Sequence, residues 1–296
     1  MGFHCDLPDK IGHALASVST SMPYPYFSVD QILDENQYEL LRSEFPDGLI
    51  QHDSENSGAL ELYPDTPIDT RLSQEWQTFL GYLRSDETRK RLVGICYHHT
   101  LRRYPRWMRP LAQFRLSNSD NYQIRLSFNS STGGRYLRPH SDNSYKVLAL
   151  ILYFSDTSYE SIELGTRFFS PKSRRAEKEA VRRFNRLADS RVIRSLPLQL
   201  LPMTSCNVHN NTSDETSRSV AEKWFSDNFN LEHIVGFKGN RVAGFIKTQN
   251  SFHAVDLRSA PADEVRRSLL INLNLKHSLI ARLGQMFRVR VLRKST

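Results

Sequence analysis

Short apolar segments follow one another in the second half of the chain, and their arrangement limits the folds that this sequence can adopt. Residues 122–128 alternate apolar and polar side chains, and residues 147–154, 242–246, 268–275 and 287–292 are mostly apolar, as strands of a sheet are. Helical patterns do not alternate regularly with these segments, which argues against a parallel sheet. We expect a mainly β protein with flanking helices and a double-stranded β-helix core, the jelly-roll, cupin-like architecture.

The first third of the chain is expected to brace this core with helices. Residues 31–45, with Asp30 as their cap, carry apolar side chains at helical spacing, and so do residues 73–83 and 87–97. Residues 51–66 are polar and predict a loop. The helices would pack on the outside of the sheet.

A polar and partly helical stretch, residues 171–232, interrupts the predicted strands. A segment of this length between barrel strands is usually a lid over the site or a peripheral addition. We expect one domain over residues 1–296, in which residues 1–111 form a helical support and residues 112–296 form the jelly-roll core. The insertion lies between two segments that carry candidate site residues, one around residue 140 and one around residue 253. We therefore expect it to act as a lid.

A His-x-Asp pair, His140 and Asp142, stands just before the apolar residues 147–154. Side chains two positions apart in a strand point to the same face, so the imidazole and the carboxylate would lie side by side. Such a pair alone is more often two surface residues in a turn. His253 follows residues 242–246 as a strand-end residue would, and the three together match the two-histidine, one-carboxylate set that binds Fe(II) and leaves positions open for co-substrate and oxygen.

The order of these features resembles the Fe(II)/2-oxoglutarate-dependent dioxygenases, and among them the prolyl-hydroxylase-like branch. The matching segments are the His-x-Asp pair, then Asn250-Ser251-Phe252-His253-Ala254-Val255, and then Arg266-Arg267-Ser268-Leu269. The resemblance implies a jelly-roll fold and an iron ion bound by His140, Asp142 and His253.

The same resemblance implies residues for the co-substrate. An arginine at the start of the last long strand would pair with the far carboxylate of 2-oxoglutarate, since a guanidinium forms two parallel charge-assisted bonds. Arg266 matches an Arg-x-Ser pattern with Ser268, and Arg267 is the alternative, because only one of the two can point inward. Tyr153 stands where related enzymes carry a tyrosine that hydrogen-bonds this carboxylate.

The implied reaction uses Fe(II), 2-oxoglutarate and O₂ to hydroxylate an unactivated C–H bond, and desaturation, cyclisation or epimerisation would begin in the same way. The carboxylate of Asp142 argues against halogenation, which needs that position for a halide. A small metabolite is the expected substrate, with an amino-acid-derived compound of a biosynthetic pathway as the first choice. The candidate substrate-binding residues are Tyr136, Arg138, Asn143, Tyr145 and Arg125.

Two other functions are compatible with the same residues. A non-oxygenase metal-binding barrel of the cupin type, either an isomerase or a binding protein, would need no 2-oxoglutarate. A hydroxylase of protein side chains would use the same centre on a macromolecule, and the formal charge of +8 gives this alternative slight support.

Composition bears on compartment and partners. Three cysteines, Cys5, Cys96 and Cys206, lie far apart and predict reduced thiols in a cytoplasmic protein. No apolar stretch predicts a secretory signal or a membrane span. The basic residues 172–194 contain one aromatic residue, which indicates a solvated helix surface rather than a nucleic-acid interface.

Overall fold

The computed structural model describes residues 6–18, 24–54, 57–102, 106–143, 145–156, 160–184, 206–208, 215–248 and 250–276. The strands in these ranges are β1 (Tyr26–Val29), β2 (Gln51–Ser54), β3 (Ser57–Leu62), β4 (Tyr122–Thr132), β5 (Tyr136–Ser141), β6 (Lys146–Phe154), β7 (Ser161–Pro171), β8 (Cys206–Asn207), β9 (Phe229–Phe237), β10 (Val242–Ile246), β11 (His253–Asp256) and β12 (Val265–Leu275). The helices are α1 (Leu7–Ser17), α2 (Glu35–Ser43), α3 (Gln74–Arg84), α4 (Asp86–Arg102), α5 (Arg109–Leu116), α6 (Arg174–Phe184) and α8 (Glu215–Asn228), with short 3₁₀ turns at Asp47–Leu49, Arg106–Met108 and Ser119–Asn121.

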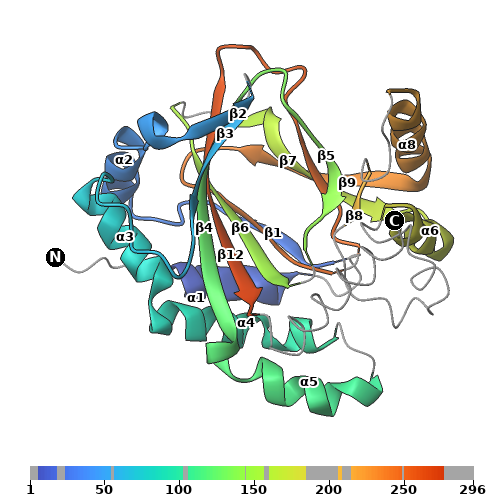
Figure 1. Ribbon diagram of the computed structural model, residues 1–296, viewed down its shortest axis with the longest axis horizontal. Coiled ribbons are helices and arrows are strands. Elements are labelled where there is room, and N and C mark those ends of the chain that lie inside the picture. The colour runs from blue at the N-terminus through green and yellow to red at the C-terminus, as the bar shows by residue number, and fades with distance from the viewer. Residues whose placement is uncertain are drawn as a thin grey trace, which may run out of the picture.

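Two antiparallel sheets face each other as the halves of a jelly roll (Figure 1). The larger sheet has seven strands in the order β1-β10-β6-β12-β4-β3-β2, and the smaller has five in the order β8-β5-β11-β7-β9. Neighbouring strands in space are mostly distant in sequence, as in a double-stranded β-helix. The predicted fold class is confirmed.

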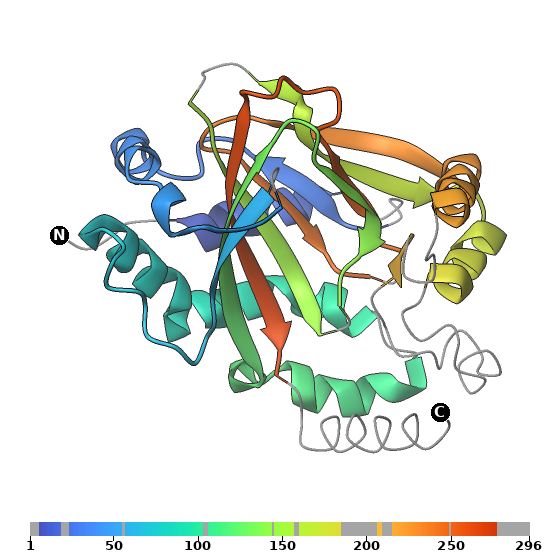
Figure 2. The same ribbon diagram turned by 45° about the horizontal axis from the view of Figure 1, so that its top comes forward.

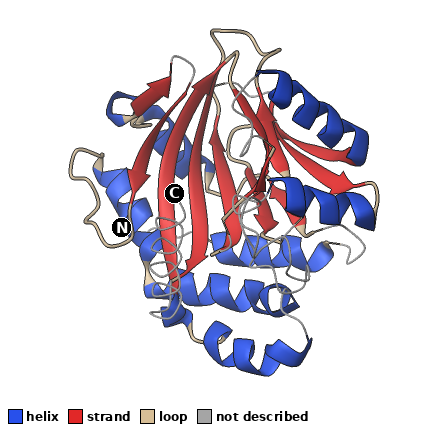
Figure 3. Ribbon diagram, turned by 45° about the vertical axis from the view of Figure 1, so that its right-hand side comes forward, coloured by secondary structure: helices blue, strands red, loops and turns tan. Residues whose placement is uncertain are grey.

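Helices cover the outer face of the seven-stranded sheet (Figure 3). Helices α1, α3 and α4 contact its strands, and α2 and α5 pack against α3 and α4. Every second residue of β6 from Leu148 to Phe154 joins this core, and the Trp76 ring of α3 meets Phe128 of β4 at 4.6 Å between centroids. Each large apolar side chain buried here contributes about 1.5–3 kcal/mol, so this face carries much of the folding energy.

The inner face of the same sheet has an apolar half and a polar half. On β6 and β10, Ile151 and Phe245 pack against residues of the five-stranded sheet such as Phe168. On β12, the buried residues of this face include Asn272 and Asn274. The space between the sheets is therefore not a uniform apolar core, and its polar half borders the candidate site.

The insertion helices α6 and α8 lie beside the five-stranded sheet (Figure 2). Phe184 of α6 and Phe225 of α8 form an aromatic cluster with Phe229 and Phe252. The Nδ2 group of Asn250 also donates a hydrogen bond to Glu177 of α6 at 2.6 Å. The insertion thus braces the loop that leads into β11. Within the described ranges, no helix has both the length and the apolar composition that a membrane crossing needs.

Residues 51–66 contain a β-hairpin where their polarity predicted a loop. Strand β3 pairs with β4 residue by residue, from Ser57 with Ser131 to Leu62 with Leu126. This pairing is long-range, so the local pattern does not reveal it. Together with β1, the hairpin means that residues 1–111 supply three strands of the larger sheet in addition to helices.

Other element boundaries also differ from the sequence-based expectation. Helix α2 begins at Glu35 because Asp34 caps it by accepting the backbone N–H of Asn36, while Asp30 forms ion pairs with Lys238 and Arg241. Helices α1 and α5 were not expected, and the strands expected from residue 112 begin only at β4. The strand expected at residues 287–292 lies outside the described residues.

Candidate metal centre

Pairing of β5 with β11 brings His140 and His253 together. The two residues are direct partners in the antiparallel ladder, and their ring centroids are 4.3 Å apart. The next aligned pair is Leu137 with Val255, so β5 carries one extra residue over this interval. This β-bulge lets both Leu137 and His140 face the cavity between the sheets.

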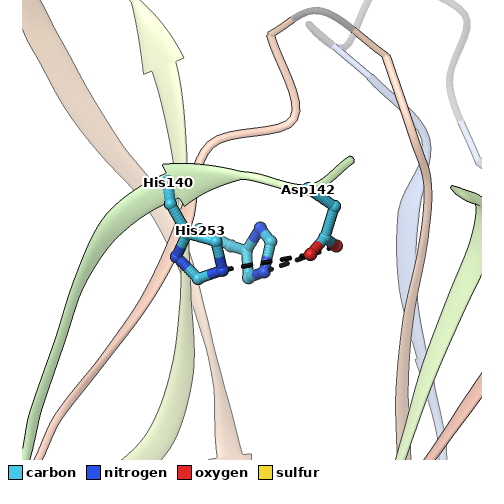
Figure 4. Close-up of side chains that lie close together, drawn as sticks. All are labelled: His140, Asp142 and His253. Atoms are coloured by element: carbon cyan, nitrogen blue, oxygen red, sulfur yellow. Dashed lines mark ion pairs between the residues drawn. The ribbon is translucent and has the colours of Figure 1, made fainter. Parts of the chain in front are cut away.

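Asp142 follows the end of β5 and directs its carboxylate toward both imidazoles (Figure 4). Its Oδ1 lies 4.0 Å from Nε2 of His140, and its Oδ2 lies 3.8 Å from Nε2 of His253. One ligand atom from each of the three residues lies within 4.8 Å of the others. Oδ2 of Asp142 is buried and has no hydrogen-bond partner among the described residues.

Backbone hydrogen bonds fix the tautomer of both histidines. Nδ1 of His140 donates to the carbonyl oxygen of Arg138 at 2.9 Å, and Nδ1 of His253 donates to that of Ser251 at 3.0 Å. Because a carbonyl oxygen can only accept, each Nδ1 carries the proton and each Nε2 presents a lone pair to the centre. A partner on the second ring nitrogen is typical of metal-binding histidines.

The electrostatics keep all three groups in the forms that bind metal ions. Burial lowers the pKa of His140, and burial together with the neighbouring His140 ring lowers the pKa of His253 to about 3. Burial alone would raise the pKa of Asp142, but the neighbouring positive charge, chiefly the Lys146 ammonium, outweighs it and holds that pKa well below its usual value. At neutral pH the imidazoles are therefore neutral and the carboxylate is ionised, as metal coordination requires.

A cavity of about 200 Å³ connects these three residues to the inner face of the seven-stranded sheet. Ala149, Ile151 and Phe245 form an apolar wall, and Arg266 and Asn272 belong to a polar wall. Apolar walls with a few placed polar groups are typical of small-molecule sites.

Arg266 is the buried cation of this cavity, with 6% of its surface exposed. Its Nε donates to the carbonyl oxygen of Leu164 at 2.8 Å, and its Nη2 donates to Oγ1 of Thr166 at 3.2 Å. No carboxylate of the described residues forms an ion pair with it, although its neighbour Arg267 has two.

Tyr153 reaches Arg266 through Thr166. The Tyr153 hydroxyl lies 2.6 Å from Oγ1 of Thr166, and the Arg266 guanidinium lies 5.1 Å from the centroid of the Tyr153 ring. Tyr153 is fully buried and does not line the cavity itself. Its place behind Arg266 holds the guanidinium in position.

Arg267 points to the opposite face of the sheet, as the alternation along β12 requires. It forms ion pairs with Asp47 at 2.8 Å and with Asp156 at 2.5 Å. Of the two arginines named from the sequence, only Arg266 faces the cavity.

Tyr136 and Arg138 do not reach the cavity. Both have the same parity as His140, but the bulge reverses the alternation between Leu137 and His140. Arg138 forms an ion pair with Glu222 of α8 at 2.9 Å, and the ring of Tyr136 lies 3.9 Å from the guanidinium of Arg258. These side chains belong to the side of β5 that faces α8.

The remaining three substrate candidates also lie outside the cavity lining. Asn143 donates to the Tyr145 hydroxyl at 2.8 Å within the turn between β5 and β6. Arg125 is on the inner face of β4, opposite Asn272 in the ladder, but it is paired with Glu61 at 2.9 Å. Only Arg125 shares a sheet face with the site.

Lys146 and Asn272 are among the cavity-lining residues that the sequence did not single out. The Nζ group of Lys146 lies 3.0 Å from Oδ1 of Asp142. Oδ1 of Asn272 is buried and has no partner among the described residues. The available signal for Asn272 was its polarity within the apolar run Leu270-Ile271-Asn272-Leu273, which marks a polar position on the inner face.

Within the described ranges, no residue of the insertion lines the cavity. Residues 185–205 and 209–214, which lie between its two helices, are outside the described residues. The interpretation of the insertion as a lid therefore stays a prediction, whereas its contacts with the loop before His253 are observed.

No family model and no curated protein matches the sequence. Solved structures similar to it include a Pseudomonas putida prolyl-4-hydroxylase, with 12% identity, coverage of 90% of this chain and 99% of that one, and a TM-score of 0.44. HygX from Streptomyces hygroscopicus, with nickel and 2-oxoglutarate bound, has 12% identity, coverage of 86% and 84%, and a TM-score of 0.44. A 2OG-Fe(II) oxygenase family oxidoreductase from Burkholderia pseudomallei has 10% identity, coverage of 93% and 94%, and a TM-score of 0.44.

These similar structures are of the class that the sequence resemblance indicated. Identities and TM-scores of this size do not determine the reaction, which depends on the residues of the site.

Proposed function

We propose that the protein is an Fe(II)- and 2-oxoglutarate-dependent oxygenase that hydroxylates an unactivated C–H bond of a small metabolite. The observation that carries the proposal is the pairing, in one cavity, of a His-Asp-His centre with a buried arginine that has no carboxylate partner among the described residues.

The residues of the centre fit an Fe(II) ion. Two neutral imidazoles present Nε2 lone pairs, and a buried carboxylate oxygen without a hydrogen-bond partner faces them. Lys146 pairs with the other oxygen of this carboxylate, Oδ1, so the unmet capacity lies at Oδ2. A buried polar atom without a partner is costly, and coordination of a cation would remove that cost. His140, Asp142 and His253 would hold the ion on one side, as the two-histidine, one-carboxylate set does in non-haem iron oxygenases.

Arg266 supports a dianionic co-substrate. A buried guanidinium without an ion partner is unfavourable, and a carboxylate satisfies it through two parallel hydrogen bonds. Leu164 and Thr166 hold one side of the guanidinium, and Tyr153 packs behind it. Arg266 would thus bind and orient the far carboxylate of 2-oxoglutarate from the polar wall.

When bound, Fe(II), 2-oxoglutarate and O₂ supply oxidative decarboxylation of the keto acid coupled to oxidation of a C–H bond. The chain places the apolar residues Ala149, Ile151 and Phe245 around the centre, where they restrict water. Asn272, with its unpartnered oxygen, would orient the substrate by accepting a hydrogen bond.

The cavity beside the centre has a volume of about 200 Å³ and walls of two kinds. The polar residues on one wall and the apolar residues on the other favour a substrate with both kinds of surface, as an amino-acid-derived metabolite has.

Succinate release from protein loaded with Fe(II) tests the proposal. We expect slow 2-oxoglutarate consumption without substrate and faster consumption, matched by product, with members of a panel of amino acids and related metabolites. A panel of unstructured peptides serves as the comparison. Stimulation by peptides alone would favour the protein hydroxylase, and no 2-oxoglutarate consumption by iron-loaded protein would contradict the oxygenase.

A further inference from the structure

Lys146 contacts the carboxylate of the candidate centre from the side of the cavity. Its Nζ lies 3.0 Å from Oδ1 of Asp142, and the side chains are 16% and 14% exposed. Exposed ion pairs contribute little, but a pair this far removed from water is not of that kind. The other oxygen of the same carboxylate, Oδ2, has no partner among the described residues and faces His253.

The backbone that carries Lys146 is fixed independently of its side chain. The N–H of Lys146 donates to the carbonyl oxygen of Asn143 at 3.1 Å, and the N–H of Leu275 donates to that of Tyr145 at 2.8 Å. The ammonium therefore reaches back over four residues from a rigid strand end to a carboxylate just beyond β5.

A second lysine holds the backbone of the ligand segment. Nζ of the fully buried Lys247 donates to Oγ of Ser141 at 3.1 Å and to the carbonyl oxygen of Thr248 at 2.5 Å. Ser141 lies between His140 and Asp142 in the sequence, and Thr248 lies before His253. Since Lys247 and strand pairing position the segment, the rotation of the Asp142 carboxylate is what remains for Lys146 to fix.

We propose that Lys146 is a positioning residue that engages Oδ1 of Asp142 and thereby reserves Oδ2 for the metal ion. The inference rests on the proposed function of the centre, and nothing in the sequence motif requires a lysine at this place. The carboxylate would bind the ion through a single oxygen, because the second oxygen is held by the ammonium. Outer partners that orient a metal ligand in this way typically change metal affinity about 10–100-fold.

The alternative is that Lys146 is only a counter-charge for a buried carboxylate. Its ammonium would then repel a divalent cation, and its removal would leave metal affinity equal or make it tighter. Removal of the lysine should weaken metal binding if Lys146 positions the carboxylate, and should leave it equal or tighter if Lys146 is only a counter-charge. The inference can therefore be tested with a metal ion alone and without 2-oxoglutarate.

The experiment is titration with Co(II), followed by its visible d–d absorption and by calorimetry, in wild type, Lys146→Met and Lys146→Arg. We expect Lys146→Met to bind Co(II) about 10–100-fold more weakly and with a changed d–d spectrum, and Lys146→Arg to recover most of the affinity. Lys223→Met removes one positive charge from an exposed pair with Asp227 and serves as the matched control. It should bind Co(II) as wild type does.

A double-mutant cycle with Asp142→Asn tests whether Lys146 acts through this carboxylate. In the Asp142→Asn background, Lys146→Met should have no further effect on Co(II) affinity. Equal or tighter binding by Lys146→Met, or an additive loss in the cycle, would overturn the proposal. Failure of the proposed function would look different, since wild-type protein would then bind Co(II) at the three residues while iron-loaded protein consumes no 2-oxoglutarate. No Co(II) binding by wild-type protein at these residues would overturn both proposals.

Discussion

The two faces of strand β12 differ although their residues alternate along one segment. Leu269, Ile271 and Leu273 point outward and are fully or almost fully buried in the core beneath the helices. Arg266 and Asn272 point inward to the cavity, and each of them has unsatisfied hydrogen-bonding or charge-pairing capacity among the described residues. Side chains of the protein fill the outer face, whereas the inner face keeps polar groups without partners among the described residues.

This difference indicates how stability and function are divided in the molecule. Substitutions on the outer face should cost folding free energy, whereas substitutions on the inner face should cost ligand binding with little change in stability. Adjacent residues on β12 provide matched pairs of substitutions that test whether the two faces differ in this way.

The largest effect is expected for the centre itself. His253→Ala removes a ligand, so metal affinity should fall by more than the about 10–100-fold that the loss of an outer partner causes, and activity should reach background. Thermal unfolding of the metal-free protein should change little. His233→Ala, at a histidine of β9 that stacks on Tyr26, is the control and should retain metal binding. Equal losses in both variants would contradict the assignment.

Leu269 and Leu270 compare the two faces directly. Leu269→Ala removes a fully buried side chain and should lower the free energy of unfolding by about 3–5 kcal/mol. Leu270→Ala shortens a half-buried side chain that lines the cavity and should cost only about 1 kcal/mol. Urea denaturation of the two variants measures the difference, and equal costs would show that the inner face is as important for stability as the outer face.

Arg266 and Arg267 make the same comparison for co-substrate binding. Arg266→Met should weaken 2-oxoglutarate binding at least about thirtyfold, because removing one partner of a buried charge pair costs about 2 kcal/mol or more. Arg267→Met breaks surface ion pairs with Asp47 and Asp156 and should leave this affinity unchanged. Calorimetric titration of the metal-loaded protein would measure both, and a larger loss for Arg267→Met would reverse the assignment.

The smallest effect concerns pH. An imidazole with the ordinary pKa of about 6.5 would weaken metal binding about tenfold at about pH 5.5. Because burial lowers the pKa of His140 and lowers that of His253 to about 3, the loss of Co(II) affinity between neutral pH and about pH 5.5 should be smaller than this tenfold loss.

The same pKa shifts should make the stability of the metal-free protein depend on pH. Below about pH 6.5 the unfolded histidines take up protons that the folded ones do not, so the free energy of unfolding should fall as the pH falls toward 3. A stability that stays constant over this window would contradict the burial of the two imidazoles.

The sequence was sufficient for the features that depend on local pattern. The range expected for β10, residues 242–246, agrees with the structure, and the helical spacing around Trp76 agrees with α3. It was not sufficient for the hairpin of β2 and β3, because polar residues become strands there through pairing with β4. Helix α1 had a usable signal in the spacing of Leu7, Ile11 and Leu15.

The candidate metal ligands could be predicted because motif spacing determines their positions. The directions of side chains next to a β-bulge could not be predicted. The two histidines and Asp142 come together through strand pairing, which the order of motifs implies. The bulge in β5 has no sequence signature that separates it from regular alternation, and Tyr136 and Arg138, which were named as substrate-binding candidates, lie on the side of β5 that faces α8. Lys146 was missed because its contact with Asp142 depends on the geometry of a turn.

The most direct test of the central account is the visible absorption spectrum of anaerobic protein loaded with Fe(II) and titrated with 2-oxoglutarate. We predict a weak charge-transfer band that appears with 2-oxoglutarate, is absent from His253→Ala, and requires a higher 2-oxoglutarate concentration in Arg266→Met. Protein that holds iron at the three residues and shows no band at saturating 2-oxoglutarate would contradict the account.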